Sequence, residues 1–293
     1  MADWATFTGF TGLVLVVLLS FAYFSRGIPH GDGVSSLPSD DTDARVATDD
    51  EADRFGGDAA EFDGDDTAST TVVSASADDH ERDRPTPTPV VPRAHSSSSP
   101  ADMPTYLLIA NVAVSQGLLG GFLAMGAWYA GIPASALGIS VGNVPMELAL
   151  GTVLGVALYG FNRIGSSLSR HLGFAPDEAL RESLTPETTM GWVLLLVVAL
   201  PLIAGFEELL FRGALIGALS VGFDVSPWLL AAVSSVAFGA GHTAQGRLGI
   251  VVTGLLGFVL AATFVLTGSL LVVFVAHYLV NALEFVGNEL FGW

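Results

Sequence analysis

The sequence contains no cysteine and no lysine. Without cysteine, the chain can form no disulfide, carries no thiolate nucleophile and offers no ligand for a cysteine-type zinc site. All eleven basic residues are therefore arginines, against 29 acidic residues. These arginines form no basic cluster, and this argues against nucleic-acid binding, which needs concentrated positive charge.

The negative charge is concentrated in one part of the chain. The net charge is −18, yet 51% of the residues are hydrophobic and the mean hydropathy is +0.58. Residues 26–103 hold 18 of the 29 acidic residues and 6 of the 11 basic ones. An acidic surface with few cations is typical of proteins adapted to high salt, where charge repulsion is screened. We therefore expect a halophilic source.

The first hundred residues divide into an apolar segment and a polar, acidic one. Residues 4–24 form an apolar run long enough to cross a hydrocarbon core of ~30 Å. Asp3, rather than a basic segment, precedes this run, which favours an uncleaved anchor over a signal peptide. Residues 26–103 are rich in Asp, Ser, Thr, Pro and Gly and bury too little apolar surface to fold. We interpret them as a disordered acidic linker, acting either as a tether or as a substrate-recruiting arm.

From residue 105 onward the chain is almost continuously apolar. One segment, at 190–220, is too long for a single span and contains Pro201, which predicts either one kinked helix or two shorter ones. The other apolar segments fall at about 105–130, 145–162, 226–242, 248–266 and 268–287. The sequence thus predicts an all-α, polytopic transmembrane helix bundle with about seven or eight spanning helices, in a multi-pass protein of the cell membrane.

These observations predict three parts of the chain. They are an N-terminal anchor helix at 1–25, the linker at 26–103 and a multi-helix intramembrane domain at 104–293. Arginines in the polar loop at 163–189 place that loop inside the cell by the positive-inside rule. Counting spans backwards then places the linker inside and the N-terminus outside.

A few polar residues interrupt the apolar helices of the C-terminal half. Charged groups inside a membrane are energetically costly, and they usually face a bundle interior where they pair or serve a function. The candidates are Glu207, Glu208, Arg212, His242, His277 and Asn281.

Helical spacing assigns different roles to these residues. Glu208 and Arg212 stand four residues apart and can pair on one face, whereas Glu207 is rotated by about 100° from Glu208. Phe238 lies one turn before His242 and can form a wall of the same site. The sequence therefore predicts a supporting ion pair beside one free carboxylate.

Distances along the chain test whether the candidates can meet. Glu207 and His242 lie at nearly equal distances on either side of Asp224, so an antiparallel helix pair would bring them to the same depth. The same arithmetic, applied through turns near residues 245 and 267, leaves Asn281 roughly 9 Å and His277 roughly 15 Å from that depth at ~1.5 Å per residue. Straight helices alone do not bring the last pair level.

If the residues converge, two chemical arrangements are open. In one, Glu207 takes a proton from water, and the imidazoles of His242 and His277 with the amide of Asn281 stabilise the oxyanion formed at a peptide carbonyl. In the other, His242 and His277 join a carboxylate as ligands of Zn²⁺. The chain has no H-E-x-x-H motif, so the compact zincin arrangement is excluded.

At these residues the sequence resembles the CPBP, or Abi, group of intramembrane proteases, which includes CAAX prenyl proteases and bacteriocin-processing enzymes. Its three motifs stand in order on successive apolar segments: E-E-x-x-x-R at 207–212, F-x-x-x-H at 238–242 and H-x-x-x-N at 277–281. The resemblance covers about residues 190–287.

The resemblance implies an all-helical membrane endopeptidase. It implies that Glu207 activates water, that His242, His277 and Asn281 complete the site, and that Glu208 and Arg212 support it. The family is commonly labelled metalloprotease, although a glutamate-activated water without a held metal is also proposed for it. The implied substrates are membrane-associated proteins or peptides, such as prenylated CAAX proteins or pro-peptides.

A second class of function fits the same polar residues. Intramembrane Glu and His also serve proton relays, so the chain could be a non-enzymatic scaffold, immunity factor or ion-binding protein. The complete set of three motifs favours the enzyme.

Overall fold

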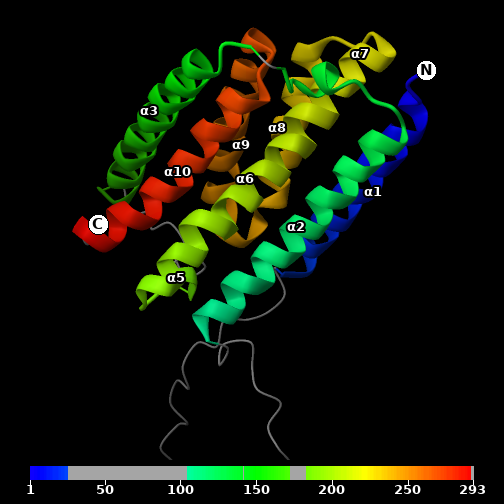
Figure 1. The fold of residues 1–293 in the computed structure, drawn as a ribbon. Helices are drawn as coiled ribbons and strands as arrows, with labels where there is room; N and C mark the ends of the chain where they lie inside the picture. Colours follow the sequence, from blue (N-terminus) through cyan, green and yellow to red (C-terminus); the bar gives the residue numbers. More distant parts are fainter. Residues whose placement is uncertain (26–103, 141, 172–182, 292–293) are drawn as a thin grey trace, which may run out of the picture. The chain divides into compact units, whose positions relative to one another are not determined.

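The computed structural model describes residues 1–25, 104–140, 142–171 and 183–291 (Figure 1). Within these residues the regular structure is helical and contains no strand, which confirms the all-α prediction. The predicted linker at 26–103 lies outside the described residues.

The helices follow the predicted apolar segments closely. One long helix is assembled from consecutive α-helical and π-helical stretches: α5 (Thr189–Val193), η3 (Leu194–Ala199), α6 (Leu200–Glu208), η4 (Leu209–Ala218) and α7 (Leu219–Phe223). The other α-helices are α1 (Trp4–Ser25), α2 (Thr105–Tyr129), α3 (Val144–His171), α8 (Pro227–Gly241), α9 (Gly246–Thr267) and α10 (Leu270–Phe291). Short 3₁₀ turns, η2 (Ala134–Leu137) and η5 (Thr243–Gln245), precede α3 and α9.

Six helices among the described residues are long and apolar enough to cross a membrane. The helix α8 has 15 residues, or about 22 Å, and is shorter than the ~30 Å hydrocarbon core. The six spanning helices are thus roughly consistent with the seven or eight predicted, and the segment predicted at 226–242 forms the shorter α8. The segment predicted as a polar loop at 163–189 begins later than expected, because α3 continues to His171.

Pro201 does not divide its segment. A single helical run extends from Thr189 to Phe223, and 35 residues are about 50 Å at 1.5 Å per residue. The π-helical stretch Leu194–Ala199 ends two residues before the proline. Wider turns of this kind remove the clash between a proline ring and the preceding turn. The prediction of one helix, rather than two, is therefore the correct alternative.

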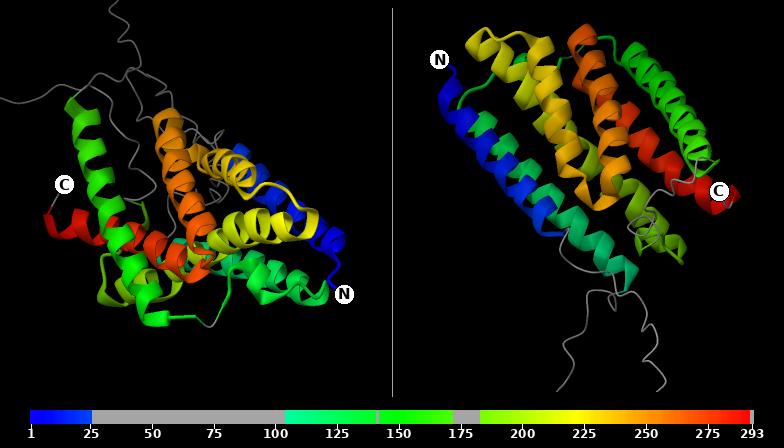
Figure 2. Two further views of the ribbon diagram at one scale, coloured as in Figure 1. Left: turned by 90° about the horizontal axis from the view of Figure 1, so that it is seen from above. Right: turned by 180° about the vertical axis from the view of Figure 1, so that it is seen from behind.

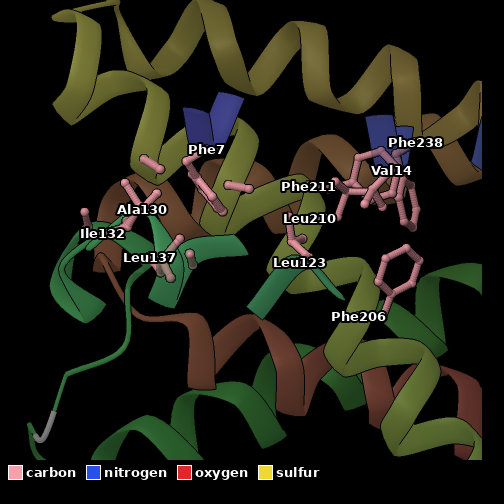
Figure 3. Packing of buried hydrophobic residues seen from close by; sticks show 14 residues of the cluster. Phe7, Val14, Leu123, Ala130, Ile132, Leu137, Phe206, Leu210, Phe211 and Phe238 are labelled. Atoms are coloured by element: carbon pink, nitrogen blue, oxygen red, sulfur yellow. The ribbon is translucent and has the colours of Figure 1, made fainter. Parts of the chain in front are cut away.

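The helix α1 packs among the helices of the C-terminal part. It lies alongside α2 and also contacts α8 and η4 (Figures 1 and 2). Phe7 and Val14 of α1 are buried in the same apolar cluster as Phe206, Phe211 and Phe238 (Figure 3). Burying such side chains contributes roughly 1.5–3 kcal/mol each in water, and in a bilayer the gain comes mainly from close packing.

The helices α3 and α10 pack closely against each other. A Cβ atom added at Gly151 would lie 2.7 Å from the carbonyl oxygen of Val272, and one at Gly155 would lie 2.9 Å from that of Ala276. Two glycines one turn apart thus let the backbones approach, as small residues do in membrane helix pairs. This contact holds the helix that carries His277.

Candidate active site

The long helix supplies an ion pair that is completely buried. Glu208 is the last residue of α6, and Arg212 follows one turn later inside η4; both are 0% exposed. Arg212 Nη1 donates to Glu208 Oε1 at 2.8 Å. Charges this deep are stable only when paired and hydrogen-bonded.

Arg212 also ties the long helix to two other elements. Its Nη2 donates to the backbone carbonyl of Gly257 in α9 at 2.9 Å, and its Cζ lies 4.7 Å from the centre of the Phe238 ring in α8. The guanidinium therefore makes an ion pair, a backbone hydrogen bond and a cation–π contact at once. It fixes α8 and α9 against η4.

His277 is held by the same ion pair. Its Nδ1 lies 2.7 Å from Glu208 Oε1, the atom that also accepts from Arg212. A carboxylate that accepts requires Nδ1 to carry the proton, so neutral His277 presents a lone pair on Nε2. That Nε2 lies 3.6 Å from Glu207 Oε2.

His242 reaches Glu207 from the opposite helix. It stands at the C-terminal cap of α8 with φ −106° and ψ 33°, outside helical geometry. Its Nδ1 donates to the carbonyl of Phe238 at 2.8 Å, and its Nε2 lies 3.9 Å from Glu207 Oε1. Both histidines therefore turn Nε2 towards the same carboxylate.

Phe238 is the packing centre of this cluster. Its ring lies against Phe211 at 5.0 Å between centroids, against His242 at 4.6 Å and against His277 at 5.8 Å. Figure 3 shows Phe211 and Phe238 together at the edge of the apolar cluster. The predicted wall residue thus touches both imidazoles.

Asn281 differs from the other predicted residues. It is half-buried one turn after His277 on α10, and its side chain makes no hydrogen bond or ion pair with the described residues. The structure thus brings Glu207, Glu208, His242 and His277 together and leaves Asn281 without a polar contact to them. The expected offset of His277 by roughly 15 Å is wrong, because its ring contacts both glutamates.

The sequence reasoning missed three hydroxyl groups that join the site helices to their neighbours. Ser234 donates to the Phe211 carbonyl at 2.7 Å, Tyr278 to that of Leu196 at 3.2 Å, and Thr243 to that of Ala22 at 2.6 Å. Each lies close to a candidate in the sequence: Ser234 is one turn before Phe238, and the others directly follow a histidine. Their position next to candidate residues in the sequence could have indicated these three hydroxyl groups.

The cluster contains the donor types that zinc sites use. Two imidazoles and a carboxylate are common zinc ligands, and both imidazoles have Nδ1 bonded to an oxygen as metal-binding histidines do. Within the described ranges, however, no group of three or more His, Asp or Glu side chains is placed to hold a metal ion. The roles proposed below are therefore assigned to protein groups, and the metal is left to experiment.

The centre of the cluster is rich in acceptors. Glu207 Oε2 is buried and has no hydrogen-bond partner, and the two Nε2 atoms facing Glu207 are acceptors in the neutral rings. A small molecule that donates hydrogen bonds, such as water, satisfies such a centre. A carboxylate beside that molecule is then suited to remove its proton.

Comparison with known proteins supports the resemblance. Residues 189–283 match the family model described as Type II CAAX prenyl endopeptidase Rce1-like. The matched segment runs from α5 into α10 and contains Glu207, His242 and His277. No curated protein and no solved structure gives a significant match to the chain. The match and the six long apolar helices indicate a multi-pass integral membrane protein.

Proposed function

We propose that this protein is an intramembrane endopeptidase which uses Glu207 to activate water. The proposal starts from the match of residues 189–283 to the family model described as Type II CAAX prenyl endopeptidase Rce1-like. The observation that carries the proposal is the placement of one buried carboxylate between two imidazole Nε2 atoms, at 3.6 Å and 3.9 Å.

The proposed reaction begins with water beside Glu207. The carboxylate takes one proton, and the water oxygen bonds to the carbonyl carbon of the scissile peptide. Negative charge then develops on the former carbonyl oxygen. Glu207 passes this proton on to Nε2 of His277, which is 3.6 Å away and carries no proton in the neutral ring, and the new Nε2–H donates to that oxygen. The Glu208 carboxylate at Nδ1 stabilises the positive ring formed in this step.

Collapse of the intermediate breaks the C–N bond. Glu207 takes the proton back from His277 Nε2 and gives it to the leaving amine, and the carbonyl re-forms as a carboxylic acid. His242 lies on the other side of Glu207 and supports the same charge, while Asn281 is one turn from His277 and supplies an amide donor if a substrate brings them together. Removing one donor of this kind typically lowers kcat by about 10²–10³.

The proposed substrates are membrane-associated proteins or peptides with a prenylated C-terminal C-a-a-X sequence. The test is cleavage of a farnesylated C-a-a-X reporter by the protein in liposomes, with release of the terminal tripeptide measured by mass spectrometry. We expect release by the wild type and none by Glu207→Ala.

Two controls complete this test. The same reporter without the farnesyl group reports whether the lipid is recognised, and a pro-peptide reporter tests the other substrate class. Equal products from wild type and Glu207→Ala with every reporter would contradict the endopeptidase proposal and favour the ion-binding or scaffold function.

A separate prediction concerns the metal. We expect the purified protein to keep its activity after dialysis against 1,10-phenanthroline and to contain well under one zinc per chain by mass spectrometry. His242→Ala should lower activity without changing metal content. Stoichiometric zinc that is lost together with activity in His242→Ala would instead establish the zinc mechanism with His242 and His277 as ligands.

A further inference from the structure

The π-helical stretch before Pro201 leaves one backbone carbonyl without a donor from its own helix. Leu200 N–H donates to the carbonyl of Leu195, five residues earlier. If this five-residue spacing continued, residue 201 would be the donor to the carbonyl of Leu196. Proline has no N–H, so the Leu196 carbonyl receives no hydrogen bond from residue 201.

Tyr278 supplies the missing donor from another helix. Its phenolic O–H donates to the Leu196 carbonyl at 3.2 Å, and its half-buried ring packs with the apolar cluster around Leu195, Ala199 and Leu200. A buried carbonyl without a partner is costly, particularly where no water competes. The bond therefore links α10 to the long helix at a site fixed by the proline.

The position of Tyr278 next to His277 gives this bond a consequence for the site. Consecutive residues point about 100° apart on a helix. Tyr278 bonds the long helix at Leu196, and His277 bonds it at Glu208. Two bonds on two faces restrict the rotation of α10 about its axis more tightly than either bond alone.

We propose that Tyr278 is a positioning residue for the endopeptidase reaction. Its hydrogen bond to the carbonyl left without a donor by Pro201 sets the rotation of α10, and so holds His277 Nε2 in front of Glu207. The proposal rests on the proposed function for its kinetic readout, but its structural readout is independent of activity.

The test is a double-mutant cycle between Tyr278 and Pro201. Tyr278→Phe removes only the hydroxyl, and kcat should fall about tenfold while KM stays unchanged, since one hydrogen bond that orients a site residue is lost. Pro201→Ala supplies an N–H that can donate to Leu196. In the Pro201→Ala background, Tyr278→Phe should therefore lower kcat less than twofold.

Tyr159→Phe is the matched control. Tyr159 is also half-buried and packs on α10, against Gly287, but donates no hydrogen bond to the described residues. This variant should keep the wild-type kcat. Equal losses from Tyr278→Phe in both Pro201 backgrounds, or no loss in either, would overturn the positioning role.

A second measurement separates this proposal from the proposed function. Because the chain has no cysteine, spin labels can be attached at Val193→Cys on α5 and Glu289→Cys on α10, both exposed positions. The distance distribution between the labels should broaden in Tyr278→Phe and narrow again when Pro201→Ala is added. An unchanged distribution in Tyr278→Phe would overturn the proposal, whether or not the wild type cleaves any reporter.

Discussion

Replacing Glu207 by glutamine is expected to lower kcat for the farnesylated reporter by about 10²–10⁴, the contribution of a positioned general base. Glutamine has nearly the same shape but cannot accept a proton from water at neutral pH. Glu207 makes no direct hydrogen bond to the described residues, and its nearest imidazole nitrogens are 3.6 Å and 3.9 Å away. The fold should therefore be retained, with KM and the thermal unfolding temperature close to those of the wild type.

Glu284→Gln is the control for this substitution. Glu284 is a half-buried glutamate; it lies two turns after His277 on α10 and accepts from Asn162 Nδ2 of α3 at 2.7 Å. We expect this variant to keep kcat within about twofold of the wild type, since replacing the Glu284 carboxylate by an amide changes no atom of the proposed centre. If Glu207→Gln and Glu284→Gln had equal activity, Glu207 would not be the general base.

The pairing of Glu207 with His242 could be predicted because it depends on one hairpin. Asp224 forms the turn with φ 53°, in the left-handed region that Asn and Asp adopt more readily than other residues with a side chain. The helices on either side run continuously to the two residues. Equal numbers of residues then give equal depth, and the observed 3.9 Å contact agrees.

The position of His277 could not be predicted by the same arithmetic for two physical reasons. Counting residues assumes antiparallel helices, but α10 crosses α9 obliquely (Figure 2). In addition, the His242 ring turns back along α8 to bond the Phe238 carbonyl, which moves its nitrogen by about one turn, ~5 Å. Neither crossing angles nor side-chain direction at a helix end are encoded in residue spacing.

The hydrogen bonds that support the site could be predicted from the sequence only in part. The i, i+4 spacing of Glu208 and Arg212 predicted their pairing, which the structure has. It could not indicate that the second guanidinium nitrogen bonds Gly257, because a backbone carbonyl carries no residue-specific signal. The π-helical stretch before Pro201 was likewise not predictable, because the proline indicated either a kinked helix or two shorter ones.

Breaking the buried ion pair should have the largest effect on stability. Arg212→Met leaves the Glu208 carboxylate buried with only His277 as a partner, and removing one member of a buried pair destabilises proteins by about 3–5 kcal/mol. The measurement is the free energy of unfolding by SDS in mixed micelles. Arg247→Met, at an exposed position near the start of α9, is the control and should change it by less than about 0.5 kcal/mol.

The double variant Glu208→Gln with Arg212→Met separates stability from catalysis. It contains no buried unpaired charge, so most of the lost stability should return, as it does when buried ion pairs are replaced by neutral groups. Activity should remain low, because the neutral amide that replaces the Glu208 carboxylate cannot stabilise the imidazolium form of His277. If the double variant recovered both stability and kcat, the pair would serve only to hold η4 against α9. If it recovered stability alone, the carboxylate at His277 Nδ1 would be part of the reaction, and the buried arginine would be present because that carboxylate must stay charged.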